Sequence, residues 1–207
     1  MTVNAETVGP TIPAATPRRP PERIQTPRLL LRQWIESDAR QLAEAIDSSA
    51  VDLQKWTPWV VPDPREVGVL EQRVRKFRAQ FESAESFVYG VFDPAEARVL
   101  GQAGLYARVG PDALEVGYWI RSDCAGQGYA TEAARALLEA AFSACAVARV
   151  ELRCGVHHSA SQAIARRLGF RFKEIVPEDM YADFGASQQL AVFELTSSDY
   201  FSSQALT

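Results

Sequence analysis

Cysteine and histidine are scarce in this chain, which has three cysteines and two histidines in 207 residues. Cys124, Cys145 and Cys154 are odd in number and show none of the paired spacings of metal sites, which argues against a disulfide framework and a zinc site. His157 and His158 are adjacent, so their side chains point in different directions, and no further cysteine or histidine cluster accompanies them. The sequence therefore predicts reduced thiols and no metal.

The chain also lacks a long apolar segment and a strong excess of charge. No segment approaches the ~20 uninterrupted apolar residues that a membrane-spanning helix needs, and the start of the chain lacks the basic and then apolar order of a secretory signal. The net charge of −4 favours neither a nucleic acid nor an anionic membrane as a general partner, and the basic residues at 73–78 indicate a solvated helix face. We expect a cytoplasmic protein without membrane or nucleic-acid partners.

The composition indicates one globular domain behind a flexible arm. Hydrophobic residues make up 47% of the chain and charged residues 23%, which is enough for one sizeable core and too little for two. Residues 1–24 are rich in proline, threonine, alanine and arginine, and such a segment cannot bury enough apolar surface to offset its ordering entropy. We therefore expect a disordered arm at 1–24 and a domain at 25–203.

Apolar periodicity and turn residues predict a mixed α/β fold. Strands are expected at 26–32, 87–92, 99–107, 114–120, 149–153, 170–175 and 190–195, and helices after Asp38, at 65–83, after residue 128 and at 159–168. Dense turn residues between the strands from 87 to 120 imply an antiparallel meander, and strands and helices alternate afterwards. The segment 51–64 carries prolines and tryptophans, which predicts an irregular loop.

The most informative stretch is a glycine-spaced turn that runs directly into an amphipathic helix. Gly126 and Gly128 let the chain turn tightly and expose backbone N–H groups, and a helix start adds unpaired N–H groups and a positive dipole end. A pyrophosphate would fit there. One face of the helix is apolar, which would pin it against a sheet, and Glu132 and Glu139 are expected to face water. The apolar positions are Ala134, Leu137, Leu138, Ala141, Phe142 and Cys145.

Three interpretations of this turn compete with a plain loop before a core helix. A dinucleotide-binding fold places a glycine turn between strand and helix, and Glu151 falls where a ribose-binding acid is expected. However, Thr131 occupies the third glycine position, and the turn follows a meander rather than opening a parallel sheet. A nucleotide triphosphatase loop fails because no Lys-Ser/Thr pair follows either glycine.

The third interpretation is a family resemblance. The segments LEVGYWI (114–120), AGQGYATEA (125–133) and HSASQAIARRLGF (158–170) resemble the GNAT superfamily of acetyl-CoA-dependent N-acetyltransferases, and within it the RimJ/RimL type that acetylates ribosomal-protein N-termini. DLQKWTPWV and FELTSSDY extend the likeness over about residues 26 to 201. It implies a largely antiparallel mixed sheet with helices on both faces and a central pair of parallel strands that splay apart.

The resemblance also implies a site for acetyl-CoA as cosubstrate. The acyl-CoA loop of the family, Gln/Arg-x-x-Gly-x-Gly/Ala, is matched at 125–130, with Ala125 where Gln or Arg is usual. His158 stands where the family has an asparagine, ahead of Ser161, which matches the family's serine. A backbone N–H between Val116 and Ile120 would bind the oxyanion. The expected cofactor-binding residues are Val116, Gly117, Tyr118, Trp119, Ala125, Gly126, Gln127, Gly128, Tyr129, Ala130, Thr131, His158 and Ser161.

Two further residues are expected to carry the chemistry. Glu115 lies between Leu114 and Val116, and alternation places it on the opposite strand face, toward the cleft, as general base; a solvated strand glutamate is the alternative. The hydroxyl of Ser161 would help to protonate the departing thiolate, or would only begin a helix. Cys154 could line the cleft, although a buried inert thiol is the simpler interpretation.

Trp56 and Trp59 are the candidates for binding the acceptor, because aromatic walls can clamp a peptide end, a sugar or a nucleobase; they could instead cap the core. We expect transfer to a primary amine, either a protein N-terminus or a small molecule such as an antibiotic or an aminoacyl conjugate, by direct attack in a ternary complex. A CoA-binding regulatory module without transfer is the alternative. A homodimer is compatible with the sequence.

Overall fold

The computed structural model describes residues 17–57, 66–177 and 189–205. The strands are β1 (Arg23–Gln25), β2 (Leu30–Gln33), β3 (Ser86–Phe92), β4 (Val99–Tyr106), β5 (Ala113–Ile120), β6 (Arg149–Gly155), β7 (Arg171–Pro177) and β8 (Gln189–Thr196). The helices are α1 (Ala39–Asp47), α2 (Ala50–Trp56), α3 (Val67–Glu82), α4 (Tyr129–Glu139), α5 (Ser159–Arg167) and α6 (Ser197–Gln204), with the 3-10 helices η1 (Glu36–Asp38) and η3 (Ser122–Cys124) and the π-helical turn η4 (Ala140–Ala144).

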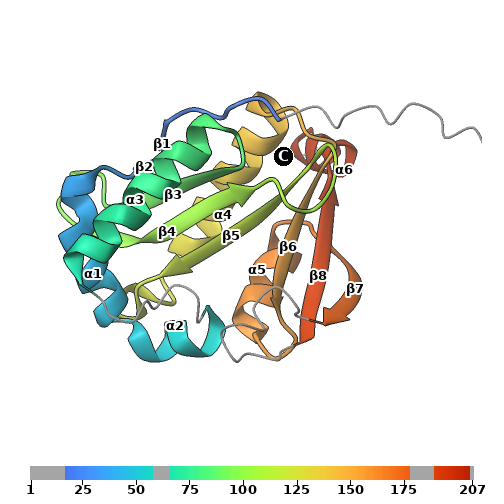
Figure 1. The fold of residues 1–207 in the computed structure, drawn as a ribbon. Helices are drawn as coiled ribbons and strands as arrows, with labels where there is room; N and C mark the ends of the chain where they lie inside the picture. Colours follow the sequence, from blue (N-terminus) through green and yellow to red (C-terminus); the bar gives the residue numbers. More distant parts are fainter. Residues whose placement is uncertain (1–16, 58–65, 178–188, 206–207) are drawn as a thin grey trace, which may run out of the picture.

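The described strands form one mixed sheet in the order β1-β2-β3-β4-β5-β6-β8-β7. Among the described strands only β5 and β6 are parallel, and their register pairs Ala113–Val116 with Arg149–Leu152. Beyond these residues β5 continues along β4 to Ile120, while β6 continues along β8 to Gly155. The two strands therefore diverge in the middle of the sheet (Figure 1), which confirms the predicted mixed α/β fold with a splayed parallel pair.

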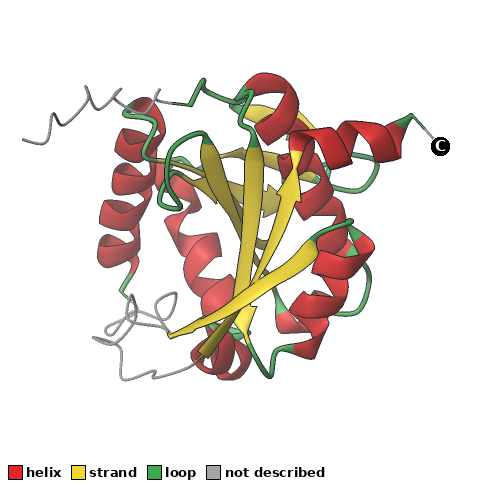
Figure 2. Cartoon of the chain, turned by 90° about the vertical axis from the view of Figure 1, so that its right-hand side faces the viewer, coloured by secondary structure: helices red, strands yellow, loops and turns green. Residues whose placement is uncertain are grey.

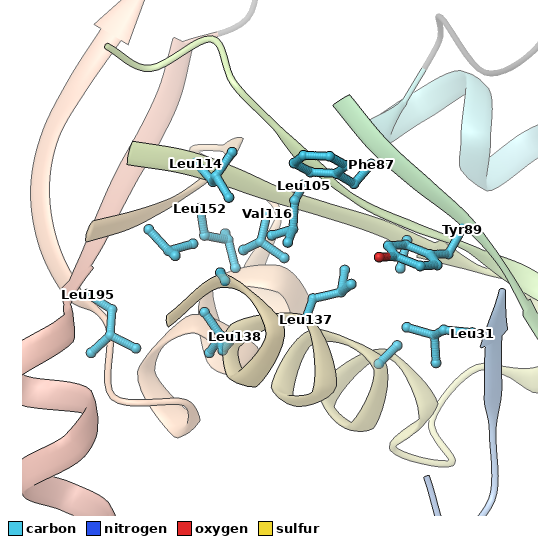
Figure 3. Packing of buried hydrophobic residues seen from close by; sticks show 14 of the residues in the cluster. Leu31, Phe87, Tyr89, Leu105, Leu114, Val116, Leu137, Leu138, Leu152 and Leu195 are labelled. Atoms are coloured by element: carbon cyan, nitrogen blue, oxygen red, sulfur yellow. The ribbon is translucent and has the colours of Figure 1, made fainter. Parts of the chain in front are cut away.

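Helices cover both faces of the sheet (Figure 2). On one face, α4 inserts Leu137 and Leu138 among strand residues that include Val116 and Leu152 (Figure 3). On the other face, α1 and α3 pack over a second cluster that includes Trp119. Because side chains alternate along a strand, successive residues of β5 serve the two cores in turn. The apolar face predicted for residues 134–145 is buried throughout.

The start of the sheet differs from the expected strand at 26–32. Only its second half is extended, as part of β2, and residues 26–29 form a turn closed by the Thr26 N–H and the Leu29 carbonyl at 2.9 Å, across which β2 pairs antiparallel with the unpredicted β1. Tyr89 donates a hydrogen bond to the Pro21 carbonyl at 2.8 Å, which ties the preceding residues to the sheet. β1 thus begins two residues before the expected start of the domain at residue 25, and residues 1–16 of the predicted arm lie outside the described residues.

Two helices correct the sequence-based element assignment. The prediction of an irregular segment from residue 51 is wrong for α2, because the prolines that suggested a loop begin only at Pro58, after the helix has ended. The Leu53 side chain is buried in the core beneath α1 and α3, so it packs α2 against that core. The unpredicted α6 begins where the Thr196 side chain accepts a hydrogen bond from the Asp199 N–H, an N-cap that the sequence signals only through its Thr-x-x-Asp spacing.

Candidate active site

A cavity of about 670 Å³ opens where β5 and β6 diverge. Residues from both faces of β5 line it, because Glu115 and Gly117 belong to the α3 face and Tyr118 packs with the α4 core. The cavity is thus continuous from one face of the sheet to the other. Side chains from α2, α3, β6 and α5 complete it, including Trp56, Arg73, Lys76, Phe77, Arg153, Cys154, His158 and Ser161.

The glycine turn follows β5 in the chain, between η3 and α4, and its residues do not line the cavity. Gly126 and Gly128 have φ values of +75° and +83°, a left-handed conformation that residues with a Cβ rarely adopt. A Cβ on Gly126 would meet no atom within 4 Å, so the turn borders open space. The first helical hydrogen bond runs from the Glu132 N–H to the Gly128 carbonyl at 3.0 Å, which leaves the preceding N–H groups of the helix start without helical partners.

The two glutamates of α4 differ in exposure. Glu139 is exposed as predicted, and it also accepts a hydrogen bond from the Tyr200 hydroxyl at 2.6 Å. Glu132 is partly buried and accepts hydrogen bonds from Thr26 and Arg28, so the expectation that it faces water is wrong. The partners of Glu132 lie in the β1–β2 turn, about a hundred residues away in the sequence, so no local pattern predicts the contact.

Glu115 lies on the face predicted for it. Leu114 and Val116 are in the α4 core, whereas the Glu115 carboxylate, only 5% exposed, lines the cavity from the opposite face. Arg108 binds it with two hydrogen bonds of 2.9 and 2.6 Å. Arg153 lies 4.0 Å from the same carboxylate. Glu115 is therefore a buried, ion-paired carboxylate and not a solvated strand residue.

Gly117 is the first residue of β5 beyond the pairing with β6. A Cβ at this position would lie 3.2 Å from the Tyr106 ring, so the absence of a side chain lets Tyr106 lie across the strand. The register with β4 is unbroken here, which excludes a bulge. Trp119 is buried in the α1 and α3 core and also borders the cavity, and Val116 is buried in the α4 core.

Ser161 lies on the opposite side of the gap from Glu115. Its hydroxyl is 3.2 Å from the Tyr118 hydroxyl, and it also hydrogen-bonds Cys154. Burial raises the pKa of Tyr118, which outweighs the opposing effect of Ser161. Burial likewise raises the pKa of the Cys154 thiol, which keeps it protonated and unreactive. Two hydroxyls that hold their protons thus meet in the cavity.

The fold and this geometry match a known family over most of the chain. The family model described as an acetyltransferase (GNAT) domain matches residues 28–171. The chain belongs to the GNAT acetyltransferase family. The predicted acyltransferase is thereby confirmed.

Two relatives support the RimJ/RimL resemblance, and a further structure shares the fold. The Bacillus subtilis protein named "Putative ribosomal N-acetyltransferase YdaF" is 26% identical over 169 residues, which cover 81% of this chain and 90% of the relative. A structure titled as a "putative ribosomal-protein-serine acetyltransferase" from Vibrio cholerae is 27% identical with a TM-score of 0.72, covering 86% and 99%. RimL in complex with CoA shares the fold at 22% identity and a TM-score of 0.74, covering 84% and 98%.

The cavity lining contains an aromatic stack. The ring of Trp56 lies 4.1 Å from that of His158 at 20°, and the Lys55 ammonium lies 4.6 Å from the Trp56 ring. Burial, followed by the charge of Lys55, lowers the pKa of His158, so this imidazole is neutral at pH 7. Trp56 thus connects α2 to the start of α5. Trp59, the second predicted acceptor-binding residue, lies outside the described residues.

Sequence reasoning missed two residues that contact the predicted site residues. Arg108 reaches Glu115 because the β4–β5 hairpin pairs Tyr106 with Glu115, so the predicted meander was a signal that these residues meet. Arg28 donates a hydrogen bond to the Gln127 carbonyl in the glycine turn, and no local sequence pattern predicts this contact. Within the described residues no group of three or more His, Cys, Asp and Glu could hold a metal. None of the described helices is long and apolar enough to cross a membrane.

Proposed function

We propose that this protein transfers acetyl from acetyl-CoA to the N-terminal α-amine of a protein, by direct attack in a ternary complex. The observation that carries the proposal is the cavity that opens where β5 and β6 diverge, on the strand that leads into the glycine turn. We call the part formed by the turn, the diverging strands and the start of α5 the donor side. The part between α2, α3 and strands β3–β5 is the acceptor side.

The residues of the donor side fit CoA. The left-handed turn borders open space and is followed by an 11-residue helix whose first N–H groups are free for an anion, as a pyrophosphate requires. We propose that Ala125–Thr131 bind the pyrophosphate, and that backbone groups of Val116–Trp119, together with His158 and Ser161, bind the pantetheine arm. Acetyl-CoA, when bound, supplies the activated acyl group, and the protein supplies position and proton transfer.

Proton transfer is divided between the two sides of the sheet. Glu115 is on the acceptor side, where an attacking amine must lose a proton, and Ser161 is on the donor side, where the thiolate must gain one. We propose that Glu115 accepts the amine proton, directly or through a water. Arg108 donates hydrogen bonds to both carboxylate oxygens, so a proton that Glu115 accepts must displace one of these hydrogen bonds. Such a base suits an easily deprotonated amine.

The acceptor class follows from this chemistry and from the relatives. An α-amino group has an unperturbed pKa of ~7.7–8.0 against ~10.4 for lysine, so deprotonating lysine at pH 7 costs about 3 kcal/mol more. The names of YdaF and of the Vibrio cholerae protein both point to ribosomal proteins as substrates of those relatives. A protein N-terminus is thus the acceptor that both arguments favour.

The thiolate receives its proton from the hydroxyl pair. Ser161 can donate its hydrogen to the departing sulfur and recover one from Tyr118, whose raised pKa keeps it protonated before transfer and makes it regain a proton from solvent afterwards. A backbone N–H of β5 beyond Val116, released from pairing with β6, would stabilise the oxyanion, a contribution that can reach several kcal/mol at a dry site.

An acceptor screen tests the proposal. One peptide set has free N-termini and blocked lysines, a second has blocked N-termini and free lysines, and a third set contains small amines such as aminoacyl conjugates. Mass spectrometry locates the acetyl group, and thiol release gives kcat/KM. The proposal expects the first set to dominate. Preference for small amines would support a detoxifying enzyme instead, and CoA binding without transfer to any set would support a regulatory module.

A further inference from the structure

Arg28 makes contacts that the acetyl-transfer chemistry does not explain. Its side chain lies between the β1–β2 turn and the start of α4, roughly a hundred residues away in sequence. The Arg28 Nη1 donates a hydrogen bond to the Gln127 carbonyl at 2.9 Å, and its guanidinium carbon lies 4.8 Å from the centre of the Tyr129 ring. A Cβ on Gly128 would lie 3.5 Å from Arg28 Nη2. The guanidinium is thus in contact with the phosphate-binding turn itself.

The contact with Gln127 fixes the direction of a backbone N–H. In a trans peptide the carbonyl of one residue and the N–H of the next point in opposite directions. Because Arg28 holds the Gln127 carbonyl on its own side, the Gly128 N–H is directed away from Arg28. Gly128 has little intrinsic preference for one orientation, so an external contact is needed to select it.

Arg28 also compensates a charge that would oppose an anion. Glu132 lies in the first turn of α4, where its carboxylate would repel a pyrophosphate bound at the helix start. Arg28 Nε and Nη2 lie 2.7 and 2.6 Å from Glu132 Oε2, while the Arg28 backbone N–H and the Thr26 hydroxyl bind Oε1 at 3.0 and 2.7 Å. Burial alone would raise the pKa of Glu132, but these hydrogen bonds outweigh it and lower the pKa, so the carboxylate is ionised.

We propose that Arg28 is a positioning residue for the CoA pyrophosphate: it orients the peptide unit between Gln127 and Gly128 and neutralises Glu132. This inference rests on the proposed function, since it assumes that the glycine turn binds CoA. It assigns a cofactor-binding role to the β1–β2 turn, a part of the chain outside the acyl-CoA loop.

Calorimetric titration with CoA tests the assignment without depending on turnover. Arg28→Ala is expected to weaken binding about tenfold or more, because it leaves Glu132 uncompensated and the turn unrestrained. Adding Glu132→Gln to this variant is expected to restore part of the affinity by removing the repulsion. Arg23→Ala is the matched control, since Arg23 is a comparably exposed arginine of β1 whose ion pair with Glu96 is distant from the turn in sequence and contacts.

Substrate analogues separate positioning from general destabilisation. S-acetylpantetheine lacks the pyrophosphate, so its KM is expected to be the same for Arg28→Ala and the unmodified protein, whereas the KM for acetyl-CoA rises. Equal losses with both substrates would overturn the proposal. The acetyl-CoA analogue without the 3′-phosphate is expected to show the same loss as acetyl-CoA, and disappearance of the loss would overturn the assignment to the pyrophosphate.

Two outcomes distinguish this inference from the proposed function. If the unmodified protein does not bind CoA, the proposed function fails. If it binds CoA and Arg28→Ala binds equally well, only the role of Arg28 is refuted. Should Arg28→Ala fail to fold, Arg28→Lys provides the same test, because a single ammonium group cannot hold the Gln127 carbonyl and Glu132 with the geometry of a guanidinium. Its expected affinity for CoA is intermediate, and unchanged affinity would contradict the proposal.

Discussion

The donor and acceptor sides of the cavity differ in what forms them. The donor side consists largely of backbone: two left-handed glycines, free N–H groups at the start of α4, and two strands that part after Val116 and Leu152. The acceptor side consists of side chains from several elements, with Trp56 stacked on His158 and Glu115 paired with Arg108. Backbone geometry suits a constant cosubstrate, whereas side chains can vary with the acceptor.

The largest expected effect is on the donor side. Gly128→Asp places a Cβ at a φ of +83° and adds negative charge where the pyrophosphate is proposed to bind. We expect loss of measurable CoA binding by calorimetry, together with loss of transfer. Gly110→Asp is the matched control, because Gly110 has a φ of +97° and lies in the β4–β5 turn, so it introduces the same strain and charge elsewhere. Equal loss in both variants would contradict the pyrophosphate assignment.

The difference between the two sides explains how far sequence reasoning could go. The glycine turn, the apolar face of α4 and the position of Glu115 on its strand follow from local spacing, and the structure has them where the pattern predicts. Arg108, Arg28 and the partners of Glu132 depend on which distant elements become neighbours. A hairpin register shows from nearby sequence which residues become neighbours. Among these contacts it could have predicted only the one between Arg108 and Glu115.

The same contrast applies to the elements of the fold. Turn residues and periodicity predict the antiparallel meander and the alternating strands and helices that follow it. In contrast, β1 is three residues long, and it is a strand only because it pairs with β2. In α2 only Leu53 is buried, so a helical apolar stripe was absent from the sequence. Short elements that are stabilised by tertiary contacts leave little periodic signal.

The second-largest effect is expected on the acceptor side, where Glu115 is the proposed general base. Glu115→Gln is expected to slow the chemical step by about 10² in single-turnover measurements, while CoA affinity stays unchanged. Glu151→Gln is the matched control, because Glu151 is opposite Glu115 in the register, is equally buried and is also ion-paired, but does not line the cavity. An equal fall in rate for both variants would show that Glu115 acts only through stability.

A smaller effect is expected at Trp56. Trp56→Ala removes the ring that lines the acceptor side and stacks on His158. We expect the KM for the acceptor peptide to rise by about three- to tenfold, as suits the loss of one aromatic contact, with little change in the KM for acetyl-CoA. Trp56→Phe should retain most of the affinity. If the KM for acetyl-CoA rises instead, Trp56 belongs to the donor side.

The smallest effect concerns the boundary between the two sides. His158 begins α5 on the donor side and stacks on Trp56 of the acceptor side. Its pKa is lowered in the folded protein, chiefly by burial, so below about pH 6.5 the unfolded chain binds a proton that the folded protein does not. Stability should therefore be full above that pH and should fall as the pH decreases toward the folded-state pKa.

Thermal unfolding between pH 7.5 and 5 measures this linkage. His158→Gln is expected to flatten the decline of the midpoint with falling pH by up to one proton's contribution, and His157→Gln, at the exposed neighbouring position, is the matched control. If acetyl-CoA binding encloses the His158 side of the cavity further, the bound protein should show a steeper decline than the free protein. A decline in His158→Gln as steep as in the unmodified protein would mean that folding does not lower the pKa of His158.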